Sequence, residues 1–362
     1  MLGNLEIGST ETSEPHIFGQ TPTTVRPIVP LPVRPLPAQR FLSAGEYRLL
    51  PLTIEAKALF DSHVDACDFL VADLSFSNNF MWLSRMSGFY QIIDDCFCLF
   101  SLNGNQLGML LPPIGAAGNQ ARALRTCVEI MDSYNHHVSD SRVDYVSPEF
   151  ARLLELDGDG RSPHLDDGAW LLEPAFPDYI YRTADLIELR GNSYKTKRSE
   201  INQFCRAHPN HRIEPLHRRH WDGMRELLSQ WMRARLEGLH GTAVADFIAS
   251  VELERQGIER ALAHYDALGL SGLCLIVDNR IEGFTFGERI SRNMASVLVE
   301  KTNFAIPGAA QYLFREYART YADCDYINVG DDLGLENLRR VKMSYRPVLF
   351  GEKFTLKRSE QM

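Results

Sequence analysis

Six polar residues in the last third of the chain have the types and spacing of a site for group transfer. They are Glu300, Lys301 and Asn303 after one apolar run, and Asn328, Asp331 and Asp332 after the next. Carboxylates attract an ammonium substrate and can accept its proton, so Glu300 and Asp332 are candidates for a general base or for orienting an acceptor amine. Asn328 and Asp331 join them as catalytic candidates. Ion pairing of Glu300 with a lysine, or of Asp332 with Arg339, is the structural alternative.

A turn of small residues separates the two groups. The segment 305–310 reads Ala-Ile-Pro-Gly-Ala-Ala and precedes a helical pattern. The start of a helix has free N–H groups and partial positive charge, and small residues allow a ligand to approach the backbone. Gly308 and Ala309 are therefore candidates for binding a phosphate of the donor, although an ordinary helix start fits equally well. Four side chains are assigned to the same donor subsite: Lys301, Asn303, Arg339 and Lys342.

The elements around these residues predict an α/β fold. Residues 273–277 and 281–288 have the pattern of a hairpin, and 295–300 and 325–329 of two further strands. In an open α/β sheet, ligands bind at the carboxyl ends of strands, where the six polar residues lie. The first half repeats this order, with a hairpin at 89–102 and a small-residue turn at 115–119 that opens a helix. The pattern suggests an internal duplication.

Composition restricts the class of protein. A length of 362 residues favours two domains, and a net charge of -9 gives no overall indication of nucleic-acid or membrane binding. The seven cysteines are scattered, which favours reduced core thiols and a cytoplasmic location. The sequence shows no apolar run long enough to span a membrane, no signal peptide and no metal-ligand spacing. We expect a Pro-rich tail at 1–40 and domains at 41–177 and 178–362.

One segment is strongly basic within this acidic chain. Only two glutamates oppose the basic residues between positions 190 and 219. Unopposed lysine and arginine neutralise phosphates, so this segment is the candidate for binding RNA. The RNA-binding candidates are Arg190, Lys195, Lys197, Arg198 and Arg206. An ordinary solvated helix surface is the alternative.

Several longer motifs carry a family resemblance. They are 179–191 (YIYRTADLIELRG), 194–198 (YKTKR), 332–339 (DLGLENLR) and 342–347 (KMSYRP). In this order they resemble the soluble C-terminal domain of phosphatidylglycerol lysyltransferases, over roughly residues 60 to 356. The resemblance implies two tandem domains of the GNAT (N-acetyltransferase superfamily) fold, with mixed central sheets flanked by helices. It also implies that strands 295–300 and 325–329 diverge and expose backbone N–H groups to an oxyanion.

The resemblance leaves three functions open. Characterised members move an amino acid from aminoacyl-tRNA to a lipid head group or sterol, and the basic segment fits such a donor. Val329 and Gly330 replace the usual Arg and Glu, which favours a different acceptor, such as a small metabolite. We therefore expect an acyltransferase without a tightly bound cofactor, using aminoacyl-tRNA and an amine or hydroxyl of a small-molecule or lipid-head-group acceptor. An acyl-CoA-dependent N-acyltransferase and a non-catalytic binding module are the alternatives.

Overall fold

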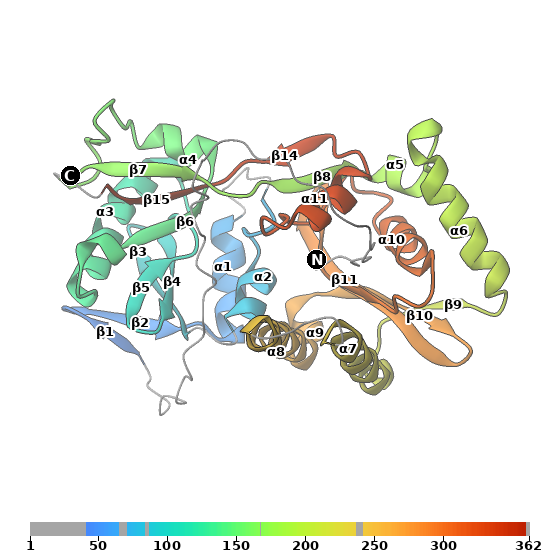
Figure 1. Ribbon diagram of the computed structural model, residues 1–362. Helices are drawn as coiled ribbons and strands as arrows, with labels where there is room; N and C mark the ends of the chain where they lie inside the picture. Colours follow the sequence, from blue (N-terminus) through green and yellow to red (C-terminus); the bar gives the residue numbers. More distant parts are fainter. Residues whose placement is uncertain (1–40, 65–70, 84–86, 167, 237–241, 360–362) are drawn as a thin grey trace.

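The fold contains two mixed sheets, and helices pack against each of them (Figure 1). It comes from a computed structural model that describes residues 41–64, 71–83, 87–166, 168–236 and 242–359. The predicted tail at 1–40 lies outside the described residues. The helices are α1 (Lys57–Val64), α2 (Phe76–Trp82), α3 (Ala117–Tyr134), α4 (Pro148–Leu153), α5 (Thr183–Glu188), α6 (Lys195–Ala207), α7 (Trp221–Leu236), α8 (Thr242–Ala263), α9 (Tyr265–Leu268), α10 (Ala309–Thr320) and α11 (Glu336–Met343).

The second sheet carries the candidate site. Its strand order is β14-β8-β13-β12-β11-β10-β9. These strands are β8 (Asp178–Arg182), β9 (Arg212–Pro215), β10 (Ser271–Val277), β11 (Arg280–Ser291), β12 (Met294–Thr302), β13 (Tyr326–Asn328) and β14 (Leu349–Gly351). The predicted hairpin is confirmed, because Asp278 and Asn279 join β10 to β11 with φ of 49° and 65°. Asn and Asp tolerate this left-handed conformation, which a two-residue hairpin turn requires.

The first sheet repeats the same plan. Its order is β1-β2-β3-β4-β5-β6-β15-β7. The strands are β1 (Leu42–Ala44), β2 (Tyr47–Pro51), β3 (Ser87–Ile93), β4 (Cys96–Asn103), β5 (Gln106–Met109), β6 (Arg142–Val146), β7 (Trp170–Pro174) and β15 (Phe354–Arg358). Asp94 and Asp95 form the hairpin turn here, also with positive φ. In each sheet a hairpin, a third strand, a long helix and a parallel strand follow one another, and this arrangement is that of two tandem GNAT-like domains.

One strand of the second half, β15, returns to the first sheet. The chain leaves the first sheet after β7 and enters the second at β8, then returns from β14 to β15. Each strand that follows a crossing pairs with the parallel strand of its sheet, β8 with β13 and β15 with β6. The two crossings run side by side, since the Ala175 N–H donates to the Lys353 carbonyl at 2.8 Å.

Different helices cover the two faces of the second sheet. The side chains of α10 (Leu313, Tyr317) share a core with Leu275 and Ala295. The opposite face packs against α7 and α8, and this core continues into α1 and α2 of the first half. The sheet is therefore buried on both sides, so polar groups on its central strands lie away from bulk water.

Candidate active site

Strands β12 and β13 diverge in the centre of the second sheet. Their parallel register joins Met294–Ser296 to Tyr326–Asn328, whereas β12 continues against β11 as far as Thr302. Beyond Ser296, within the described residues, no ladder pair links β12 to β13. Backbone groups of β12 on that side therefore have no ladder partner in β13, as the predicted oxyanion site requires.

A bulge in β12 lies at the point where the strands part. Val297 is opposite Gly287 and Val299 is opposite Phe286, so Leu298 is an extra residue. A bulge shifts the alternation of side chains between the two faces. Ala295 and Val297 accordingly belong to the α10 core, whereas Val299 belongs to the core under α7 and α8.

Glu300 presents a free carboxyl oxygen inside the protein. Its Oε2 atom is buried and has no hydrogen-bond partner among the described residues. Burial raises the pKa of Glu300 to about 8. A buried carboxyl of this kind binds a proton strongly once it is ionised, which suits a general base for an amine.

Two groups from other segments lie around Glu300. The pKa of Tyr345 is raised well above its ordinary value by burial and by the nearby carboxyl groups of Glu300 and Glu200. The Lys197 ammonium lies 4.5 Å from the centre of the Tyr345 ring and 3.9 Å from Glu200 Oε2. Sequence reasoning assigned Lys197 to RNA and missed Glu200 and Tyr345, because α6 and the segment after α11 are far from β12 in the chain.

Lys301 lies on the other face of β12. Its ammonium forms an ion pair with Glu254 of α8 at 2.9 Å and lies 4.0 Å from the centre of the Trp231 ring. Burial lowers the pKa of Lys301, and the Glu254 carboxylate opposes that shift. The structure thus places this candidate donor ligand in a buried ion pair under α7 and α8.

The turn before α10 is held by its own residues and by α6. Asn303 accepts a hydrogen bond from the Ala305 N–H at 2.9 Å and donates one to Glu282 at 2.7 Å. Gly308 has φ of 83° and caps α10, and a Cβ there would lie 2.3 Å from the Glu200 carbonyl oxygen. Gly308 therefore brings α6 against the start of α10, and Ala309 is buried directly after it.

Asp332 is fully engaged with neighbouring side chains. It accepts hydrogen bonds from Tyr179 at 2.6 Å, Arg339 at 2.7 Å and the Gly334 N–H at 2.9 Å. Burial acts to raise the pKa of Asp332, but the hydrogen bonds from Arg339 and Tyr179 lower it below its ordinary value. This is the ion pair that the sequence left as the structural alternative.

Asn328, Asp331 and Lys342 shape the loop after β13. Asn328 donates to Asp178 at 2.9 Å, and Asp331 lies 3.1 Å from the Lys353 ammonium. Lys342 donates to the carbonyls of Val329, Gly330 and Asp331, and burial lowers its pKa to about 8. The structure brings these residues together at the carboxyl end of β13, where Asp178 and Lys353 link Asn328 to Asp331.

A buried lysine at this loop was not predicted from sequence. The Lys353 ammonium contacts Asp73 at 2.7 Å, Asp178 at 2.8 Å and Asp331 at 3.1 Å. Burial acts to lower the pKa of Lys353, but the three carboxylates raise it overall, while burial raises the pKa of Asp73 to about 6. No local signal reveals this cluster, since its members come from four distant segments.

The predicted RNA-binding residues divide into two groups. Arg198 donates to the carbonyls of Leu189 and Gly191, so it closes the end of α5. Lys195 and Arg206 are exposed at the two ends of α6, and Arg190 is exposed beside Glu188. Eleven residues correspond to about three helical turns, so Lys195 and Arg206 share one face of α6.

Within the part of the chain that the structure describes, no group of three or more His, Cys, Asp and Glu side chains could hold a metal ion. In the same ranges, no helix is long and apolar enough to cross a membrane. The six cysteines that the structure describes are free thiols.

Diverging strands and a helix start beside them, present within two sheets of the same plan, are those of a tandem GNAT-like fold. The chain belongs to the family described as phosphatidylglycerol lysyltransferase, C-terminal, whose model matches residues 68–357. The predicted family is thereby confirmed.

Solved structures agree with this assignment. A conserved protein of unknown function from Bacteroides thetaiotaomicron is 28% identical, with a TM-score of 0.74 over 86% of this chain and 99% of that one. The C-terminal domain of a protein described as a lysylphosphatidylglycerol synthetase, from Agrobacterium fabrum, is 12% identical, with a TM-score of 0.59 over 85% and 93%. L-PGS from Bacillus licheniformis is 14% identical, with a TM-score of 0.54 over 84% and 92%. The search of curated proteins found no match.

Proposed function

We propose that this chain transfers an aminoacyl group from aminoacyl-tRNA to an amine or hydroxyl of a small-molecule or lipid-head-group acceptor. The observation that carries the proposal is the free, buried Glu300 carboxyl on β12, beyond the point where β12 and β13 part. Membership of a lysyltransferase family supports the aminoacyl donor.

The proposed reaction is an ordinary acyl transfer. The acceptor amine attacks the ester carbonyl carbon, and a C–N bond forms while the carbonyl oxygen becomes an oxyanion. Unpaired backbone N–H groups of β12 stabilise that oxyanion. Glu300 takes the proton from the amine, the ester C–O bond breaks, and the proton passes to the ribose oxygen of the tRNA.

Glu300 also suits the approach of an ammonium group. An unpaired carboxyl in a site of low polarity has a raised pKa, and a cation beside it lowers that pKa again. An arriving ammonium therefore favours the ionised form of Glu300. The Glu300 carboxylate is then in the form that accepts a proton from the reacting amine.

Acyl-CoA is the second candidate donor, favoured by the turn at 303–308 that leads into α10. A helix start binds phosphate whether the phosphate belongs to RNA or to a coenzyme. Purified protein is incubated with radiolabelled aminoacyl-tRNA and candidate acceptors, with and without ribonuclease pretreatment of the donor. Ribonuclease-sensitive product supports the RNA donor, whereas transfer only from acyl-CoA contradicts it. Loss of product in Glu300→Gln, with the fold retained, supports the assigned base.

A further inference from the structure

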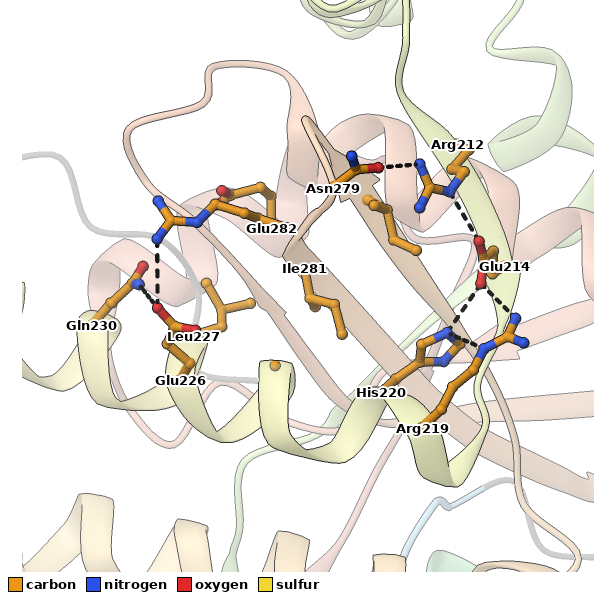
Figure 2. Close-up of a pocket in the computed structure, with 13 residues that line it drawn as sticks. Arg212, Glu214, Arg219, His220, Glu226, Leu227, Gln230, Asn279, Ile281 and Glu282 are labelled. Carbon is orange, nitrogen blue, oxygen red and sulfur yellow. Dashed lines mark hydrogen bonds and ion pairs between the residues drawn. The ribbon is translucent and has the colours of Figure 1, made fainter.

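A cavity of about 540 Å³ opens between α7 and the β10–β11 turn (Figure 2). Leu227, Ile276 and Ile281 supply its apolar lining. This volume is typical of pockets for small organic ligands. None of the residues proposed for acyl transfer lines it, so its role is a separate question.

One wall of the cavity is a preformed cationic cluster. Glu214 of β9 holds Arg212 at 2.9 Å, Arg219 at 2.7 Å and His220 at 3.0 Å (Figure 2). The hydrogen bonds from Arg212, Arg219 and His220 lower the pKa of Glu214 to about 2. A single carboxylate therefore opposes two guanidinium groups, and this wall has surplus positive charge. The side chains of Arg212 and Arg219 remain 49% and 67% exposed, so they can still contact a ligand.

The opposite wall is polar and carries the Gln230 amide, which donates to Glu226 at 3.1 Å. Arg280 lies 3.7 Å from the same carboxylate. A second amide, that of Asn279 at the hairpin turn, lies beside the cationic cluster and accepts a hydrogen bond from Arg212 at 3.1 Å (Figure 2). Amide and carboxylate groups are those that read the edges of nucleobases, and guanidinium planes stack on their faces.

The cavity lies next to the turn that is assigned to binding the donor, and Glu282 connects the two. Glu282 lines the cavity and accepts hydrogen bonds from the Asn303 side chain at 2.7 Å and from the Asn303 N–H at 2.9 Å. Asn303 opens the turn that leads into α10. A carrier with a phosphate at that turn can therefore place another part of itself in the cavity.

We propose that this cavity binds a nucleotide of the donor's carrier, with its phosphate at Arg212 and Arg219 and its base against Ile281 and Leu227. A simple anion would need only the arginines, whereas the apolar lining and the amides of Gln230 and Asn279 match a base. The inference rests on the proposed function. The same chemistry is found in the unpaired 3′ end of an RNA and in the adenosine of coenzyme A.

Direct binding tests the inference without relying on turnover. Fluorescence anisotropy measures an RNA hairpin with an unpaired 3′ end against the same hairpin with a blunt end, and calorimetry measures coenzyme A. The variants are Arg219→Gln, which removes charge, and Gln230→Trp, which fills the cavity mouth. Arg289→Gln is the matched control, because Arg289 also lies in the second sheet and pairs with a carboxylate, Asp323, at 2.7 Å. Circular dichroism checks that each variant is folded.

We expect the hairpin with the unpaired 3′ end to bind more tightly than the blunt hairpin. Each cavity variant should weaken RNA binding about fivefold to tenfold, whereas Arg289→Gln should leave it unchanged. In Arg219→Gln, the slope of the logarithm of RNA affinity against the logarithm of salt concentration should decrease by the equivalent of roughly one phosphate contact. If the cavity variants weaken coenzyme A alone, the nucleotide site stands and the RNA donor is overturned. If both cavity variants bind both ligands as the unmodified protein does, the inference is overturned. Binding that depends on the cavity without any acyl transfer would instead overturn the proposed function.

Discussion

The Lys353 ammonium lies 2.8 Å from the Asp178 carboxylate, and this ion pair joins the two crossings between the sheets. Asp178 begins β8, where the chain enters the second sheet, and Lys353 precedes β15, where it returns. Both side chains are almost fully buried, at 1% and 0% exposure. Asp73 and Asp331 complete the cluster, so one lysine holds together carboxylates from both halves.

Replacing Lys353 should destabilise the protein strongly. Lys353→Met leaves the buried Asp178 and the half-buried Asp73 and Asp331 without their cation. Breaking a buried ion pair in this way costs about 3–5 kcal/mol in the free energy of unfolding. Urea denaturation measures the change. The matched control is Lys357→Met, because Lys357 lies in the same crossing strand but forms an exposed pair with Glu173, with an expected cost of about 1 kcal/mol or less. Equal effects of the two substitutions would show that the cluster does not hold the halves together.

Local patterns explain why much of this fold could be predicted from sequence. The hairpin turns at Asp94-Asp95 and Asp278-Asn279 are short and flanked by apolar runs, and the small residues before α10 mark a helix start. Each of these signals lies within a few consecutive residues. The family motifs added the divergence of β12 and β13, which the register confirms.

The site was harder to predict because its geometry depends on distant segments. Leu298 forms a bulge within a run of apolar residues, where no alternation shows which side chain is the extra one. Lys301 consequently faces α7 and α8, although the sequence grouped it with Glu300. The partners of Asp331 and Asn328, namely Lys353 and Asp178, come from other segments of the chain, which only the folded structure brings together.

The activity should rise with pH through the titration of Glu300. A general base acts in its ionised form, and burial raises the pKa of Glu300 to about 8, so the active fraction increases from pH 6 to pH 9. Glu300→Gln should lower kcat by about 10²–10⁴-fold and abolish this rise. The measurement is a pH profile of kcat/KM. Glu336→Gln is the control, because Glu336 is 87% exposed on α11. If the pH profile of Glu300→Gln rose with the same midpoint as that of the unmodified protein, Glu300 would be excluded as the titrating group.

Asp332 should contribute to stability more than to turnover. Asp332→Asn weakens the contacts with Arg339 and Tyr179, and hydrogen bonds to a charged group contribute about 1.5–3 kcal/mol. The pKa of Asp332 is lowered in the folded state, so its contribution is present above its ordinary value of 3.8 and is lost as the pH falls through the folded pKa. Thermal unfolding of the unmodified protein and the variant should therefore converge at acid pH. A hundredfold loss of kcat with unchanged stability would instead assign Asp332 to the chemistry.

Gly308 should not tolerate a side chain. Gly308→Ala places a Cβ 2.3 Å from the Glu200 carbonyl oxygen at a φ of 83°, so α6 and the start of α10 must move apart at a cost of about 1–3 kcal/mol. Gly118→Ala is the matched control in α3 of the first half, where a Cβ would meet no atom within 4 Å. That substitution should stabilise the protein by about 0.4–1 kcal/mol, because alanine reduces the freedom of the unfolded chain. Denaturant melts measure both changes. If Gly308→Ala were as stable as Gly118→Ala, α6 would not pack against this turn.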